Sequence, residues 1–101
     1  MYLSDAGKLI LKGENVGDKL EVSEDTPDFT ESFIKFNDKA TEVYAESGNW
    51  ELFEHIKYEG LKIIICEGST FNSGYLEGKN FKNYVSSVQM VKVDADVCPG
   101  M

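Results

Sequence analysis

Two segments of the sequence place oxygen-bearing side chains in the same order. Each begins with an aromatic residue, continues through polar side chains and reaches a hydroxyl two residues before a valine, in Phe36–Val43 and in Phe81–Val88. Amide, carboxylate and hydroxyl oxygens are hard ligands, which suit Ca²⁺ better than Mg²⁺ or Zn²⁺. The same residue types also form ordinary Asx and Ser/Thr turns. The pattern alone therefore leaves a cation site and a pair of plain turns both open.

The sequence gives little support for zinc binding, nucleophilic catalysis or phosphate binding. His55 is the single histidine, so a zinc site built mainly from imidazoles is excluded, and a mixed site would need both cysteines to converge on it. No nucleophile elbow and no phosphate-binding glycine motif occurs. We therefore expect a protein that is not an enzyme, with no catalytic residue.

Two cysteines are too few for a disulfide-dense scaffold. Cys66 ends an apolar run, which favours a buried free thiol over a bridge. Cys98 lies in a polar stretch, and both a free thiol and a bridge remain open for it.

The charge balance limits the partners. With 18 acidic against 10 basic residues the net charge is -8, which argues against nucleic acid as a partner and favours a bound cation. The apolar runs are too short for a membrane span, and 42% hydrophobic residues are typical of a globular domain. No signal-like segment and no N-glycosylation sequon is seen. The compartment stays unassigned, with a cytoplasmic location favoured and secretion left open.

Short apolar stretches separated by turn residues recur along the chain, and many of their residues are β-branched or aromatic. We expect strands at Lys8–Lys12, Lys19–Val22, Glu42–Ala45, Trp50–Glu54, Leu61–Cys66 and Ser86–Val93. The repeated order of hairpin and loop suggests two copies of a four-strand unit. The predicted fold is an all-β, two-sheet sandwich of about eight strands.

Two segments depart from the strand pattern. Across Thr26–Phe36 the aromatic spacing is roughly helical, and Pro27 suits a first helical position; a short helix and a structured loop both remain open. Residues 94–101 are expected to form a loose tail, because Pro99 and Gly100 end any strand.

One run contains a characteristic order of aromatic residues and glycine. Its key positions are Trp50, Phe53, Glu54, Tyr58, Gly60 and Ile65. This order resembles the Greek-key signature of the βγ-crystallin family. A folded-over hairpin needs a residue with positive φ, which Gly60 supplies, and Tyr58 can then pack against the fold. The resemblance implies a single domain, residues 1–101, with Greek keys at about 8–46 and 49–93.

The first key departs from the signature. Gly17 keeps the glycine position, but Ile10 and Asn15 replace the two aromatics. We expect the same hairpin there, less tightly packed.

Calcium-binding members of the family carry a loop of the form Asn/Asp-Asn/Asp-x-x-Ser/Thr in each key. Residues 37–41 match it in full, and residues 82–86 match except that Lys82 replaces the first acid or amide. The resemblance implies that the two loops exchange ligands. One ion would take the Thr41 hydroxyl, the Lys39 and Leu11 carbonyls and the Asn83 amide oxygen. The other would take the Ser86 hydroxyl, the Tyr84 and Glu54 carbonyls and the Asp38 carboxylate.

The two sites are expected to differ in affinity, because ligand charge tunes calcium binding. The Asp38 site has a carboxylate, whereas the Asn83 site has neutral donors only and the ammonium of Lys82 nearby. The hypothesis is a calcium-binding, non-enzymatic protein with a structural, protective or buffering role, as a monomer or weak homo-oligomer. The alternative is a protein-interaction module or assembly subunit with weak or no calcium binding, for which action at membranes is left open.

Overall fold

The structure is a computed structural model that describes residues 7–30, 40–79, 81, 85–92 and 97–98. Its elements in chain order are β1 (Lys8–Lys12), β2 (Lys19–Val22), β3 (Glu42–Ser47), β4 (Asn49–His55), the short 3₁₀ turn η2 (Ile56–Tyr58), β5 (Glu59–Ile65), β6 (Thr70–Phe71), α1 (Ser73–Gly78) and β7 (Ser87–Val91). Each of the six predicted strands coincides or overlaps with one of these strands. The two-sheet, all-β prediction is confirmed.

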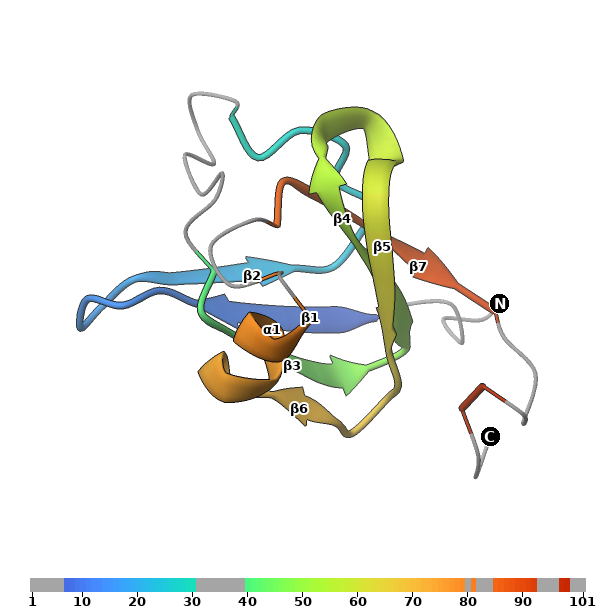
Figure 1. The fold of residues 1–101 in the computed structure, drawn as a ribbon. Helices are drawn as coiled ribbons and strands as arrows, with labels where there is room; N and C mark the ends of the chain where they lie inside the picture. Colours follow the sequence, from blue (N-terminus) through green and yellow to red (C-terminus); the bar gives the residue numbers. More distant parts are fainter. Residues whose placement is uncertain (1–6, 31–39, 80, 82–84, 93–96, 99–101) are drawn as a thin grey trace.

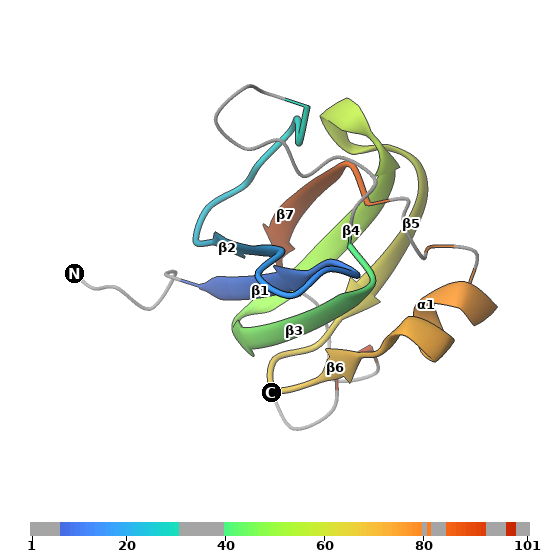
Figure 2. The ribbon, with the colours of Figure 1, turned by 90° about the vertical axis from the view of Figure 1, so that its left-hand side faces the viewer.

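The strands form two antiparallel sheets, with orders β2-β1-β3-β6 and β5-β4-β7 (Figure 1). Figure 2 shows the sheets facing each other as two layers. Strands alternate inward and outward side chains; in β1, for example, Leu9 and Leu11 are fully buried while Lys8, Ile10 and Lys12 are not. The side chains of the two inner faces together make one apolar core.

Each half of the chain contributes to the sheet of the other half. β6, from the second half, pairs with β3 of the first through Val43 and Phe71. In return Thr26 forms an isolated bridge with Val88 of β7, with backbone N to O distances of 2.8 and 3.0 Å. The described residues therefore hold seven strands and one bridge, where about eight strands were predicted. This exchange makes the two Greek keys interdependent.

The bridge also decides between the two interpretations of Thr26–Phe36 for the part that is described. Thr26 has strand-like pairing and residues 27–30 form bends and turns, which supports the structured loop. Residues 31–36 lie outside the described residues.

The second hairpin folds over as the glycine position predicts. Gly60 has φ 84° and Lys57 and Tyr58 each have φ 61°. The Tyr58 ring lies edge-on to Phe53, with centroids 5.6 Å apart. The predicted packing of Tyr58 against the fold is confirmed.

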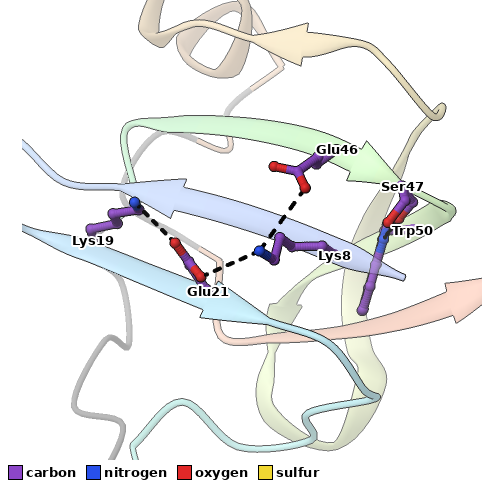
Figure 3. Close-up of polar contacts among 6 residues, drawn as sticks. All are labelled: Lys8, Lys19, Glu21, Glu46, Ser47 and Trp50. Atoms are coloured by element: carbon purple, nitrogen blue, oxygen red, sulfur yellow. Dashed lines mark hydrogen bonds and ion pairs between the residues drawn. The ribbon is translucent and has the colours of Figure 1, made fainter. Parts of the chain in front are cut away.

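Trp50 is the largest fully buried side chain. Its indole Nε1 donates to the Ser47 carbonyl at 3.1 Å, at the turn into β4 (Figure 3). A buried indole N–H needs such a partner, so this contact fixes the turn between the two halves.

The outer face of the first sheet is ionic. Lys8 lies 3.7 Å from Glu21 and 4.0 Å from Glu46, and Lys19 lies 2.9 Å from Glu21 (Figure 3). Lys19, with a smaller contribution from Lys8, holds the pKa of Glu21 below the ordinary value for glutamate. All four side chains are nearly half exposed, so these pairs contribute little to stability.

Two elements, β6 and α1, were missed from the sequence. α1 begins at the Asn72 cap, whose side chain accepts from the Tyr75 backbone N–H at 2.8 Å. The helix buries Leu76, and Tyr75 stacks on Phe71 at 4.2 Å. Only six residues long, α1 has too short an apolar pattern to be recognised.

The prediction of a free thiol at Cys66 is wrong, and of the two alternatives left open for Cys98 the bridge is the one found. Cys66 and Cys98 form a disulfide, so Cys66 is not a free thiol. Cys98 is fully buried, so the segment predicted to be a loose tail is anchored at this residue. The remaining tail residues, apart from Val97, lie outside the described ranges. Within those ranges no helix is long and apolar enough to cross a membrane.

Candidate functional site

The hydroxyl of the second candidate loop meets the end of β4. The Ser86 hydroxyl donates to the Glu54 carbonyl at 2.8 Å, and the Ser86 backbone N–H donates to the Phe53 carbonyl at 2.9 Å. Ser86 is 4% exposed. Two of the four oxygens predicted for this site are therefore in contact. A separation of 2.8 Å is short enough for both to ligate one Ca²⁺ at the usual distance of about 2.3–2.6 Å.

The other two predicted ligands of this site, Tyr84 and Asp38, lie outside the described residues. The structure thus brings two of the four predicted ligands into contact, and the site and its ligand exchange between loops stay predictions.

The first candidate loop has a similar but shifted arrangement. The Thr41 hydroxyl donates to the Lys12 carbonyl at 3.3 Å, and the Thr41 backbone N–H donates to the same carbonyl at 2.8 Å. The resemblance had implied the carbonyl of Leu11, but Leu11 lies inside β1, paired with Val43 of β3. The oxygen that the structure brings to Thr41 belongs to the next residue. Lys39 and Asn83, the remaining predicted ligands, lie outside the described residues.

Strand register explains why the two hydroxyls occupy corresponding places. Glu42, directly after Thr41, pairs with Lys12 across β1 and β3. Ser87, directly after Ser86, pairs with Phe53 across β4 and β7. In each key the hydroxyl residue therefore directly precedes a strand, β3 or β7, that pairs with the first strand of the hairpin, β1 or β4. Its side chain reaches a carbonyl near the end of that first strand.

Ser87 is a residue that the sequence reasoning missed. Its hydroxyl donates to the His55 carbonyl at 2.6 Å and accepts from the Tyr58 backbone N–H at 3.1 Å. It is fully buried and ties the folded hairpin to β7. The adjacent serines at 86 and 87 were the available signal, since the first key has Glu42 at the second position.

The carboxylate of Glu54 serves the hairpin, while its carbonyl faces Ser86. Oε1 accepts from the Leu61 backbone N–H at 3.3 Å and lies 3.5 Å from His55 Nε2. The His55 side chain, at the end of β4, is 63% exposed. A Cβ at position 60 would stand 2.6 Å from His55 Cδ2 and 3.0 Å from Glu54 Oε1. Gly60 is therefore required for both its φ and its lack of a side chain.

The surroundings of the hairpin perturb one ionisation. Partial burial, with a smaller contribution from the Asp25 carboxylate, raises the pKa of Tyr58 above its ordinary value. The neutral phenol is thereby favoured where it packs on Phe53.

Among the described residues no group of three or more His, Cys, Asp or Glu side chains converges. The predicted ligand set consists mainly of carbonyl and hydroxyl oxygens, with one carboxylate, so its chemistry is that of a weak hard-cation site. With Cys66 and Cys98 bonded to each other, a site using their thiolates would first require reduction.

The molecule is similar in structure to several known domains. A βγ-crystallin from Ciona intestinalis has a TM-score of 0.70 and 30% identity over 84% of this chain and 100% of that one. A βγ-crystallin from an archaeon has a TM-score of 0.67 and 24% identity, covering 85% and 99%. Spherulin 3a from Physarum polycephalum has a TM-score of 0.60 and 20% identity, covering 93% and 89%. No family model and no curated protein matches the chain. The similarities to the archaeal protein and to spherulin 3a, both under 25% identical, concern the fold alone.

Proposed function

Because the chain belongs to the βγ-crystallin superfamily, we propose that it is a non-enzymatic calcium-binding domain, stabilised by Ca²⁺ held between its two Greek-key loops. The ion would serve a structural, protective or buffering role. The observation that supports this most directly is the 2.8 Å contact between the Ser86 hydroxyl and the Glu54 carbonyl. It joins the loop of the second key to the end of β4 through two hard oxygen donors.

The stabilising effect follows from linkage. An ion that binds only the folded state adds RT ln(1 + [L]/Kd) to the free energy of unfolding, about 2.7 kcal/mol at a hundredfold excess over Kd. The ligands come from residues far apart in sequence, such as Ser86 and Glu54, so unfolding separates them. An ion would oppose that separation.

The two sites are proposed to differ. The Ser86 site includes the Asp38 carboxylate and has its hydroxyl and carbonyl at 2.8 Å. The Thr41 site has neutral donors, with hydroxyl and carbonyl at 3.3 Å, and Lys82 near its predicted amide ligand. Since charge on the ligands tunes affinity, the Ser86 site should bind first.

Thermal unfolding with calcium and with a chelator tests the proposal. We expect the wild-type midpoint to rise in calcium and to change little in magnesium, which prefers rigid octahedral sites. Ser86→Ala should lose most of the calcium-dependent rise, and calorimetry on Asp38→Ala should show the strong binding phase removed. Thr41→Ala should lose only the weaker phase.

The control variant is Thr70→Ala, which removes an exposed hydroxyl on β6 of the opposite sheet. It should keep the full calcium shift. Ser86→Ala also removes a buried hydrogen bond, so the quantity to compare is the difference between calcium and chelator within each variant. An unchanged midpoint in the wild type would leave the fold without a calcium function, and full binding by Asp38→Ala would refute the assigned ligand.

A further inference from the structure

The two cysteines join parts of the chain that lie 32 residues apart in sequence. Cys98 is fully buried, whereas Cys66 is partly exposed and its sulfur lies 3.5 Å from the Val97 carbonyl oxygen. The sequence contains two cysteines in all, so this bridge leaves neither available for another partner. The disulfide covalently links the residue that follows β5 to the segment beyond β7.

Sheet topology shows what the bridge spans. β5 and β7 both pair antiparallel with β4, one on each side of it, so they run parallel to each other and finish at the same end of the sheet. Ile65 pairs with Trp50, and Val91 pairs with Asn49, at the start of β4. Cys66, directly after β5, is bonded to Cys98, which lies beyond β7 in the chain. Next to Cys66 in the chain, the Glu67 backbone N–H donates to the Asn49 side chain at 2.8 Å.

The bridge closes a covalent ring of residues 66–98. This ring includes β6, which pairs with the other sheet, as well as α1 and β7. It also includes Ser86 and Ser87, whose hydroxyls contact the Glu54 and His55 carbonyls at 2.8 and 2.6 Å. β4, β5 and the hairpin turn η2 lie outside the ring. The contact of Ser86 with Glu54 thus joins the covalent ring to β4, which is outside the ring.

We propose that the Cys66–Cys98 disulfide is a reducible clamp that holds this ring against β4, so that thiol redox state controls how firmly Ser86 is kept on Glu54. The protein would act in an oxidising compartment, because persistent disulfides are rare in the cytosol. This reverses the cytoplasmic preference drawn from the sequence.

The unequal burial of the two cysteines sets the course of reduction. A thiolate of an external dithiol attacks Sγ of Cys66, the more exposed residue, forming a mixed disulfide, and Cys98 leaves as a thiolate that takes up a proton. The second thiol of the reductant then displaces Cys66, which also becomes a thiol. The dithiol is oxidised to its disulfide, and the two electrons reduce the protein bridge.

Amide hydrogen exchange without added metal tests the clamp. The samples are the oxidised protein, the protein reduced by dithiothreitol with both thiols verified by mass, and the double variant Cys66→Ser/Cys98→Ser. Reporters at the ring contacts are the amides of Ser86, Val88 and Tyr58, which donate to Phe53, Thr26 and Ser87 respectively. Controls are the amides of β1 and β2, which are outside the ring.

When the disulfide is reduced or removed, we expect protection against hydrogen exchange to fall several-fold more at the ring reporters than at the β1 and β2 controls. A disulfide that acted only on the unfolded chain would lower protection equally at all globally exchanging amides. A uniform loss, or no loss, would therefore overturn the clamp. If the double variant does not fold, the reduced wild-type protein gives the same comparison under native conditions.

A calcium arm rests on the proposed function. There we expect reduction to weaken calcium binding several-fold, and Thr70→Ala to show the same redox dependence as the wild type. Absence of binding to the oxidised protein would refute the calcium function and leave the metal-free exchange result to decide the clamp. Equal affinity of the oxidised and reduced forms would refute the redox control of the site.

Discussion

The two hairpins of this domain share a glycine with positive φ but differ in what lies over them. Gly60, with φ 84°, belongs to a hairpin that folds back so that Tyr58 packs on Phe53. Gly17, with φ 93°, belongs to a hairpin whose tip residue Val16 is fully exposed. The glycine alone therefore permits the turn, while the aromatic pair decides whether the hairpin becomes part of the tertiary structure.

Hydrogen bonding follows the same division. In the β4–β5 hairpin the Lys57 N–H donates to the Pro27 carbonyl at 2.6 Å, a contact with the other Greek key. In the β1–β2 hairpin Gly13 donates to Asp18 and Asp18 donates to Asn15, each at 3.0 Å. These latter contacts are all within the turn. Substitutions in the β1–β2 turn should therefore leave the rest of the fold undisturbed, whereas substitutions in the β4–β5 hairpin should affect its contact with the other Greek key.

The largest effect is expected from removing the aromatic ring beneath the folded hairpin. Phe53 is 5% exposed, so Phe53→Ala should lower the free energy of unfolding by about 3 kcal/mol or more. Ile10→Ala, at the corresponding place in the first key, should cost about 1 kcal/mol because Ile10 is only partly buried. Urea denaturation of both variants measures the difference. Equal losses would mean that the aromatic is not what distinguishes the hairpins.

The two glycines should respond unequally to an added methyl group. Gly60→Ala imposes a positive φ on alanine and a contact of 2.6 Å with the His55 ring, so we expect a loss of about 2–3 kcal/mol. Gly17→Ala imposes the positive φ alone, since nothing lies within 4 Å of its Cβ, and should cost about 1 kcal/mol. Chemical denaturation again gives both values. A larger loss at position 17 would contradict the open environment seen there.

The missing aromatics can be supplied to the first hairpin. Ile10→Phe with Asn15→Tyr restores the signature order before Gly17, and an aromatic pair contributes about 0.5–1.5 kcal/mol beyond burial. We expect a gain of about 1 kcal/mol and a higher thermal midpoint. The backbone contacts of Asn15 do not involve its side chain, so they should survive. No gain would show that contacts such as that between Lys57 and Pro27 are needed as well.

The smallest effect concerns pH. The pKa of Tyr58 is raised in the folded protein, first by burial and then by Asp25, so the neutral phenol is favoured by folding. This contribution to stability is complete below the ordinary tyrosine value of 10.0 and is lost as the pH rises through the higher folded value. Tyr58→Phe should therefore flatten the decline in stability above about pH 10 relative to wild type. Tyr75→Phe, on α1, is the matched control and should leave the Tyr58 contribution to the decline in place. Parallel pH profiles for wild type and Tyr58→Phe would refute the assignment.

Local patterns gave most of the fold. Lys8–Lys12 and Lys19–Val22 match β1 and β2 in full, and the run through Gly60 located the folded hairpin. These features depend on side-chain alternation and on backbone φ, which are properties of neighbouring residues. α1 and β6 were missed because six residues and two residues hold too little pattern to register.

The candidate site was predictable in part. The contact of Ser86 with Glu54 joins two residues that the family resemblance named, one in the loop and one in the hairpin, whereas the partner of Thr41 is Lys12 and not Leu11. Counting back from Gly17 selects Leu11, but the pairing of Lys12 with Glu42 brings the next carbonyl to Thr41. Register is fixed by strand pairing, which the loop sequence does not contain.

By itself the sequence determined the two hairpins and the position of the folded turn, because each depends on a few consecutive residues. The tertiary structure alone decided that β6 joins the first sheet, that Thr26 bridges to β7 and that Cys66 bonds to Cys98. Each of these contacts unites distant parts of the chain, and its formation depends on core packing that brings the partners together. The difference between the two hairpins has the same origin. The glycine that permits each turn is a local feature of the sequence, whereas the surface that Tyr58 covers exists only in the folded domain.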